Sequence, residues 1–193
     1  SGLYRFDGTS FIGFKAGRAD GHGERTNNRY DRIERDGFGQ FWVLSYDGTL
    51  YRFNPQRERF GDIANGRNIT EIYRLSSDDF CFVTSDNTIL RTRYSDAGHS
   101  CILYDSSIAA PGKVNGMYKD DGDNIWTATD AAILCNNEIA TEQPGYCIEG
   151  SAGTIRFGSG NGKIVEVIDG QLFEIESGAP YDIRLITDVP GAH

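Results

Sequence analysis

The sequence predicts an all-β fold built from repeated four-stranded units. Three observations support this prediction: a strand-turn-strand pattern recurs along the chain, glycine-rich turns separate its short apolar runs, and no apolar period of 3.6 residues persists long enough for a stable helix. The 193 residues include 24 glycines, most of them between β-branched or aromatic runs. Because glycine favours turns, we expect many short strands and almost no helix.

The recurring pattern is clearest in residues 33–53. There an apolar strand is followed by a Gly/Asp turn, a strand centred on Trp42, an Asp-Gly turn and a third strand. Residues 117–134 repeat this order, and residues 72–91 and 148–167 follow it more weakly. The central residues of the four copies lie 40, 44 and 30 positions apart: Trp42, Phe82, Trp126 and Arg156. A fourth apolar run completes each unit, which suits blades of roughly 40 residues.

Repeated four-stranded units without helices favour a β-propeller, in which each sheet buries its faces against the next sheet. A β-sandwich is the alternative, but it does not require the same motif at each interval. We expect one partial propeller over residues 1–193, with a last unit that begins as a first strand at 182–187. The expected blades are 1–15 (incomplete), 29–64, 68–105, 113–141, 145–176 and 182–193 (incomplete). This amounts to about four to five blades, and a small closed ring remains an alternative.

Two segments, residues 36–43 and 48–53, resemble the two-component regulator propeller repeat. That repeat has a D-x-x-G turn, an apolar-Trp strand and a G-L-Y-R-F/Y strand, and residues 2–8 repeat its last part. The chain departs from the pattern at Asp79 and Asp123, where the family has Gly, and at Arg156, where it has Trp. The resemblance implies the periplasmic sensor region of a bacterial hybrid histidine kinase, responding to an oligosaccharide, with the kinase domain elsewhere in a longer polypeptide.

The composition excludes several classes of partner. The net charge is −9, from 28 acidic and 19 basic side chains, without a cluster of Lys or Arg. Nucleic acid and anionic membrane surfaces both need a positive patch, so we expect neither as a partner. No apolar stretch approaches the roughly 18 residues of a membrane span, so we expect no membrane contact by this segment. The histidines (His22, His99 and His193) lack metal-ligand spacing, so we expect no metal and no cofactor.

The four cysteines are expected to be free and largely buried thiols. The blade register places Cys81 on a second strand, Cys101 on a fourth, Cys135 on a third and Cys147 on the first strand of the next unit. No two of them lie on adjacent strands of one sheet, and a disulfide needs Cα atoms within about 7 Å.

The candidate binding residues lie on one predicted loop face. In an up-and-down blade, the loops before the first strand and the turns between the second and third strands share a face. The polar residues expected there are Asn27, Asn28, Arg29, Tyr30, Ser45, Tyr46, Asp47, Asn68, Asp86, Asn87, Asn115 and Asp130. Side chains of these types suit hydroxyl-rich ligands, and the preferred ligand-binding candidates are Arg29, Tyr30, Tyr46, Asp47, Asn68 and Asn115. The alternative is that the Asn and Asp residues only form turns. Turn formation accounts least well for the presence of Arg29, Tyr30 and Tyr46 on this face.

Two other features are interpreted structurally. Trp42 and Trp126 are expected to pack between blades because of their fixed place in the repeat, although aromatic rings also suit sugars. The Gly-rich residues 158–163 are expected to form a hairpin turn, because Ile164 replaces the Ser/Thr of a phosphate loop.

The expected function is therefore ligand binding without catalysis, and we assign no catalytic residue. The expected partners are a small-molecule ligand such as an oligosaccharide and the remaining propeller blades of the same polypeptide, and the pattern leaves a homodimer open. The alternatives are a carbohydrate-active propeller enzyme and a purely structural propeller that docks other proteins.

Overall fold

The computed structural model describes residues 3–6, 8–14, 29–95, 100–151 and 153–187. These residues form a two-stranded sheet and four four-stranded sheets, and the strands of every sheet follow one another in chain order. The described residues contain no α-helix, and hence no helix long and apolar enough to cross a membrane; the one helical turn is a 3-10 turn at Gly160–Gly162. The prediction of all-β, four-stranded propeller blades is confirmed.

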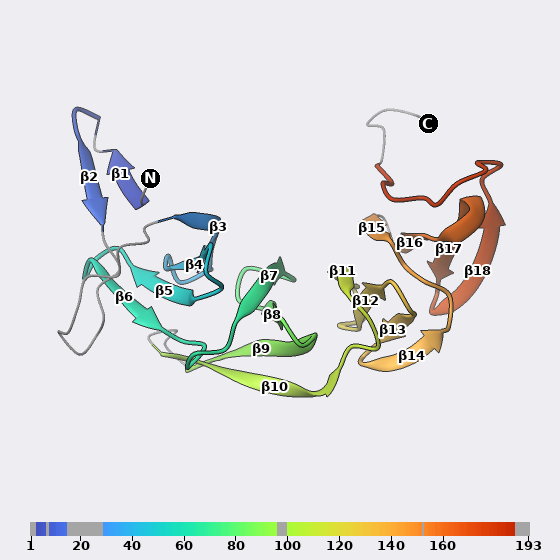
Figure 1. The fold of residues 1–193 in the computed structure, drawn as a ribbon, viewed down its shortest axis with the longest axis horizontal. Helices are drawn as coiled ribbons and strands as arrows, with labels where there is room; N and C mark the ends of the chain where they lie inside the picture. The colour runs from blue at the N-terminus through green and yellow to red at the C-terminus, as the bar shows by residue number, and fades with distance from the viewer. Residues whose placement is uncertain (1–2, 7, 15–28, 96–99, 152, 188–193) are drawn as a thin grey trace. The chain divides into compact units, whose positions relative to one another are not determined.

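The strands can be followed along the chain in Figure 1. A hairpin of β1 (Leu3–Phe6) and β2 (Phe11–Phe14) comes first. The four complete sheets are β3 (Tyr30–Arg35), β4 (Phe41–Ser45), β5 (Leu50–Asn54) and β6 (Arg59–Asp62); β7 (Ile69–Arg74), β8 (Phe80–Thr84), β9 (Thr88–Tyr94) and β10 (Cys101–Ala109); β11 (Val114–Lys119), β12 (Ile125–Thr129), β13 (Ile133–Cys135) and β14 (Glu138–Thr141); β15 (Cys147–Ser151), β16 (Thr154–Gly158), β17 (Lys163–Ile168) and β18 (Gln171–Glu176). Strand β10 runs past residue 105, where the repeat pattern placed the end of its blade.

The chain divides into two compact units. The N-terminal unit comprises residues 1–85 and 90–105, and it holds the β1–β2 hairpin, the β3–β6 sheet and most of the β7–β10 sheet. The C-terminal unit comprises residues 86–89 and 106–193, and it holds the β11–β14 and β15–β18 sheets. Each unit has its own apolar core.

In the N-terminal unit, strand β4 is buried on both faces. Successive side chains of a strand point to opposite sides. Trp42 points toward the next sheet, where its ring lies 4.8 Å from Phe82 and 6.1 Å from Phe80, centroid to centroid. Val43 points the other way, into a cluster that includes Phe53 and reaches Phe14 of the β1–β2 hairpin. Trp42 therefore packs between blades, as predicted.

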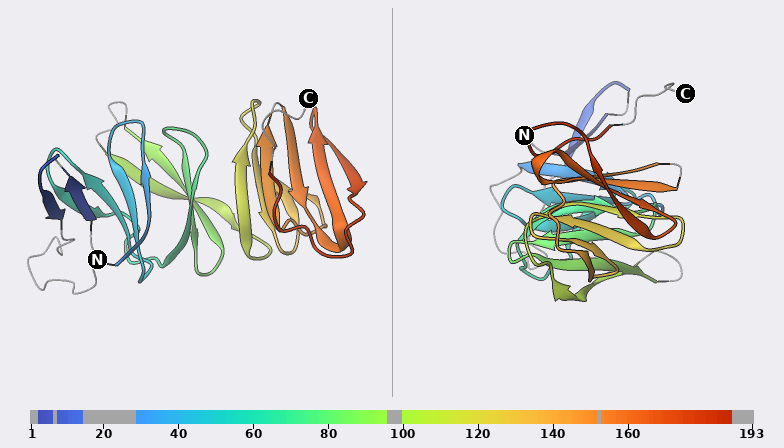
Figure 2. Two further views of the ribbon diagram at one scale, coloured as in Figure 1. Left: turned by 90° about the horizontal axis from the view of Figure 1, so that it is seen from above. Right: turned by 90° about the vertical axis from the view of Figure 1, so that its right-hand side faces the viewer.

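The C-terminal unit repeats this arrangement, with the β11–β14 and β15–β18 sheets face to face (Figure 2). Trp126 of β12 is 3% exposed, and its ring centroid lies 6.0 Å from that of Phe157 on β16. Close approach of the two sheets depends on Gly150 of β15, because a Cβ there would collide with the ring of Tyr118. The predicted packing role of Trp126 is confirmed.

Residues 158–163 form the predicted turn between β16 and β17. It includes the 3-10 turn, in which Asn161 adopts a left-handed φ of 55°. Asparagine tolerates this conformation better than most residues, which allows the chain to turn here. The segment joins two strands and begins no α-helix, whereas a phosphate loop requires a helix N-terminus.

Residues 182–187 do not form the expected first strand. The Ile183 N–H donates to the Ser159 carbonyl at 2.9 Å, beyond the end of β16, and the Cys147 thiol donates to the Ile183 carbonyl at 3.7 Å. The segment thus lies against the β15–β18 sheet without a ladder, and a strand requires a ladder of backbone hydrogen bonds. The rest of the expected last unit, residues 188–193, lies outside the described residues.

All four cysteines are free thiols on the strands where the repeat placed them: Cys81 on β8, Cys101 on β10, Cys135 on β13 and Cys147 on β15. Only Cys81 is buried, and the other three are half-buried, so the expectation of largely buried thiols is correct for Cys81 alone. Cys81 lies on an inner strand covered on both faces, whereas Cys101 and Cys147 lie on edge strands of their sheets.

Candidate functional site

The predicted residues Tyr46 and Asn68 lie together at a small cleft in the N-terminal unit. The cleft has a volume of about 240 Å³ and lies between the β4–β5 turn and the beginnings of β3 and β7. We call it the Tyr46 cleft. Its lining residues are Asp31, Leu44, Ser45, Tyr46, Gly48, Asn68, Ile69 and Thr70.

Tyr46 lines this cleft, and Arg29 lies against its ring. The ring of Tyr46 is 67% exposed, and the Cζ atom of Arg29 lies 4.7 Å from its centroid. The Arg29 carbonyl accepts hydrogen bonds from the Tyr46 N–H at 3.0 Å and from the Ser45 hydroxyl at 3.2 Å. The backbone around Arg29 is thereby fixed, and the cation–π contact holds the guanidinium over the ring.

Asn68 reaches the cleft because the β4–β5 turn contains glycine. Gly48 has a φ of +80°, and a Cβ at this position would collide with the Asn68 Oδ1 atom. The Ile69 N–H donates to the Gly48 carbonyl at 2.8 Å, which ties this turn to the start of β7. Gly48 is therefore required both by its left-handed backbone and by the close approach of Asn68.

Tyr30, Asp47 and Asn115 are not among the residues that line this cleft, and each makes structural contacts. Tyr30 stacks on Phe60, with ring centroids 6.1 Å apart, and the Asp47 carboxylate accepts a hydrogen bond from the N–H of Thr49 at 3.0 Å. In the C-terminal unit, the Asn115 amide donates to the Gly145 carbonyl at 2.9 Å. Asn27 and Asn28 lie outside the described residues.

Asp31 and Thr70 line the Tyr46 cleft, but the sequence analysis missed them. The polar site residues were expected in loops and turns, whereas these two lie within β3 and β7. One signal in the sequence could have indicated these two residues: each is a polar residue at an outward position of a first strand. A first strand pairs with one neighbour only, so its other edge is open.

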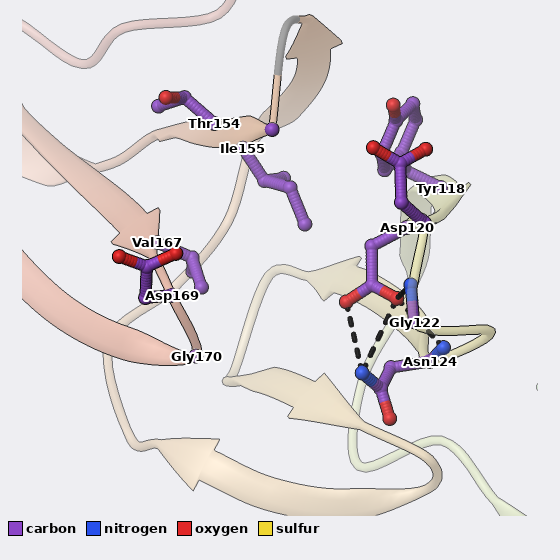
Figure 3. A pocket seen from close by; sticks show the side chains of 11 residues that line it. Tyr118, Asp120, Gly122, Asn124, Thr154, Ile155, Val167, Asp169 and Gly170 are labelled. Atoms are coloured by element: carbon purple, nitrogen blue, oxygen red, sulfur yellow. Dashed lines mark hydrogen bonds between the residues drawn. The ribbon is translucent and has the colours of Figure 1, made fainter.

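A second pocket lies in the C-terminal unit, and the sequence analysis did not predict it. It has a volume of about 320 Å³ and is bordered by the β11–β12, β15–β16 and β17–β18 turns (Figure 3). These turns are not among those assigned to the predicted loop face. We call it the Tyr118 pocket, and its lining residues are Tyr118, Asp120, Asp121, Gly122, Asn124, Gly153, Thr154, Ile155, Val167, Asp169 and Gly170.

Asp120 organises one wall of the Tyr118 pocket. Its carboxylate accepts hydrogen bonds from the backbone N–H groups of Gly122 at 2.9 Å and Asn124 at 2.8 Å. The Asn124 side-chain amide and the Trp126 indole N–H also donate to it, at 3.0 and 2.9 Å (Figure 3 shows the bonds to Asn124 and Gly122). Burial acts to raise the pKa of Asp120, but the bonds from Trp126 and Asn124 outweigh it and hold that pKa below its ordinary value.

Neither pocket resembles a metal centre. Among the residues that the structure describes, no group of three or more His, Cys, Asp or Glu side chains is placed to hold a metal ion.

The chain is similar to known proteins in fold but not in sequence. No model of a known protein family matches the chain, and no curated protein matches it. Among solved structures, two extracellular domains of proteins assigned as hybrid two-component systems of B. thetaiotaomicron are similar. One has a TM-score of 0.57 and 13% identity, covering 92% of this chain and 26% of that one. The other has a TM-score of 0.54 and 12% identity, covering 89% and 24%.

A computationally designed protein, Ika8, is similar to the same degree, with a TM-score of 0.57 and 14% identity over 83% of this chain and 54% of its own. At these identities the similarity is one of fold. The chain spans about a quarter of the length of the two extracellular domains, at 26% and 24%.

Proposed function

We propose that this chain is a ligand-binding part of the periplasmic sensor region of a hybrid two-component system and that it acts without catalysis. The fold similarity to the two extracellular domains supports this proposal, as does the repeat in residues 36–53. The kinase and the remaining propeller blades belong to the rest of the polypeptide. The observation that carries the binding role is the Tyr46 cleft, with its exposed ring beside Arg29.

The chemistry of the Tyr46 cleft suits a hydroxyl-rich ligand such as an oligosaccharide. An exposed aromatic ring can contact the apolar face of a sugar. Arg29 supplies donors, Asp31 supplies acceptors and Asn68 supplies both, so neighbouring hydroxyl groups can be paired. Most glycosidases use two carboxyl groups, and Asp31 is the one carboxylate among the lining side chains, which favours binding over turnover.

A ligand in this cleft would touch two sheets at once. Asp31 and Tyr46 belong to the β3–β6 sheet, whereas Asn68 and Thr70 belong to the start of the β7–β10 sheet. A ligand that binds both sheets favours the packing in which both sets of contacts form. This gives a physical route from binding to a change of shape or assembly, including assembly as a homodimer.

Calorimetry with a panel of neutral oligosaccharides tests the proposal. Tyr46→Ala should weaken binding about tenfold or more, equivalent to about 1.4 kcal/mol. Tyr181→Ala is a matched control, because Tyr181 is also 67% exposed and lies in the C-terminal unit. Release of a shortened sugar would indicate an enzyme instead, and absence of binding across the panel would contradict the proposal.

A further inference from the structure

The Tyr118 pocket has a preformed apolar floor. Ile155 and Val167 face each other across β16 and β17 and are 4% and 3% exposed. The ring of Tyr118 lies against Gly150, where no side chain could be accommodated. Ile155 and Val167 belong to the apolar core of the C-terminal unit and Tyr118 packs against it, so the floor does not depend on a ligand to form. The pocket volume of about 320 Å³ suits a small molecule.

The rim of the same pocket is anionic. Asp120 is held ionised by its four hydrogen-bond donors, and the carboxylates of Asp121 and Asp169 are exposed on opposite turns. No Lys or Arg is among the 11 lining residues, and the nearby Lys119 ammonium pairs with Asp123 at 2.9 Å. A cleft lined by one sign of charge concentrates ions of the opposite sign.

The combination of floor and rim narrows the class of ligand. A bare metal ion needs several converging ligands, and the described residues offer no such group. An anionic ligand would be repelled by the three carboxylates. A purely apolar ligand would remove water from them without offering a hydrogen bond or a positive charge in return. A cation that carries an apolar body satisfies both features, since an ammonium group pairs with carboxylates and the body covers an aromatic and aliphatic floor.

We propose that the Tyr118 pocket binds a small primary alkylammonium ion, with its charged group between Asp121 and Asp169 and its alkyl body over Tyr118, Ile155 and Val167. Figure 3 shows Asp169 across the cavity from Tyr118 and Asp120, with Ile155 between them. The site is independent of the Tyr46 cleft, which lies in the other unit.

Titration of the isotopically labelled chain with pentylammonium chloride, followed by amide NMR, tests this site. The amides of Gly122, Gly153 and Gly170 should shift in a saturable way, because these glycines line the pocket. Pentanol has the same body without the charge and should bind at least tenfold more weakly. Nα-acetyl-lysine amide keeps the charged ε-ammonium group on a peptide-like backbone. Comparing its affinity with that of pentylammonium distinguishes a lysine side chain of a peptide from a free amine as the ligand.

Charge variants complete the test. Asp169→Asn should weaken pentylammonium binding at least fivefold, and asparagine tolerates the left-handed φ of 50° at this position. Asp121→Asn is the second variant if Asp169→Asn disturbs the spectrum. Asp78→Asn is the matched control, since it removes one exposed carboxylate outside the pocket, from the β7–β8 turn that is the counterpart of Asp121's β11–β12 turn.

Three outcomes would overturn the proposal. Equal binding of pentanol would make the site merely apolar. An equal loss in Asp78→Asn and Asp169→Asn would show unspecific attraction to an acidic chain. Shifts spread outside the pocket glycines, or no shifts, would place the amine elsewhere or exclude it.

Discussion

The guanidinium of Arg52 is bound to the carboxylate of Asp36 inside the N-terminal unit. Its Nη2 and Nε atoms donate to Asp36 Oδ2 at 2.9 and 3.3 Å, and the two side chains are 5% and 0% exposed. The Arg52 Cζ atom also lies 4.9 Å from the ring centroid of Tyr94 and 5.7 Å from that of Trp42. Because Tyr94 belongs to β9, this ion pair of the β3–β6 sheet also takes part in packing against the next sheet.

Two other sheets also contain an ion pair. In the β7–β10 sheet, Arg91 of β9 donates to Asp79 at 2.6 Å. In the β15–β18 sheet, Arg156 of β16 donates to Glu166 of β17 at 2.7 Å. Two departures from the repeat pattern, Asp79 and Arg156, are thus accounted for as members of ion pairs.

Arg52→Met should destabilise the chain by about 3 kcal/mol, because it leaves the buried Asp36 carboxylate without its cation. Urea unfolding followed by tryptophan fluorescence measures the change. Arg5→Met is the control: Arg5 lies 3.8 Å from Glu58 and both are about half exposed, so its loss should cost less than about 1 kcal/mol. Equal effects of the two variants would contradict the assignment of the Arg52 pair as a buried support.

Trp42→Ala should cost about 3–5 kcal/mol, because it leaves a large cavity between two sheets. Tyr46→Ala, a few residues later, should change stability by less than about 1 kcal/mol, because most of that ring is in solvent. Thermal unfolding of the two variants separates the packing aromatic from the ligand-binding candidate. A marginal effect of Trp42→Ala would mean that the two sheets are not packed in solution.

Gly162→Ala and Gly170→Ala form a matched pair, since their φ angles are +74° and +75°. A Cβ at Gly162 would collide with the backbone carbonyl of Ala179, whereas a Cβ at Gly170 meets nothing within 4 Å. Both variants should pay the strain of the left-handed backbone, about 1 kcal/mol. Gly162→Ala should cost about 1–3 kcal/mol more and should speed hydrogen exchange in residues 177–187. Equal exchange there would show that this segment is not held against the turn.

Burial raises the pKa of the Cys81 thiol to about 12 from an ordinary value of 9.0. Below pH 9 both folded and unfolded states keep this proton, so the group has no effect there. Between about pH 9 and 12 only the unfolded thiol ionises, and stability should fall by about 1.4 kcal/mol per pH unit. Unfolding free energies from pH 8 to 11 should therefore fall less steeply in Cys81→Ala than in the parent chain. Identical slopes would show that the thiol is accessible to water.

Much of this fold is determined by local patterns in the sequence. The strands are short runs of β-branched and aromatic residues between turns, and Gly48 or Asn161 can turn the backbone with a positive φ. Trp42 and Trp126 occupy the same place in their repeats, so their burial between sheets follows from the repeat itself. Local patterns fail for residues 182–187, where apolar alternation suggested a strand but no ladder forms.

The sites depend on contacts that no local pattern specifies. Tyr46 and Asn68 come together because two sheets pack, and Asp31 and Thr70 join them from strands that the sequence analysis treated as structural. The Tyr118 pocket unites the turns of Asp121 and Asp169, which are far apart in the chain. The sequence by itself determined the blades, their turns and the burial of the central aromatic residues, because these depend on short-range periodicity. Only the tertiary structure decided which polar side chains share a cavity, because that depends on how neighbouring sheets pack against each other.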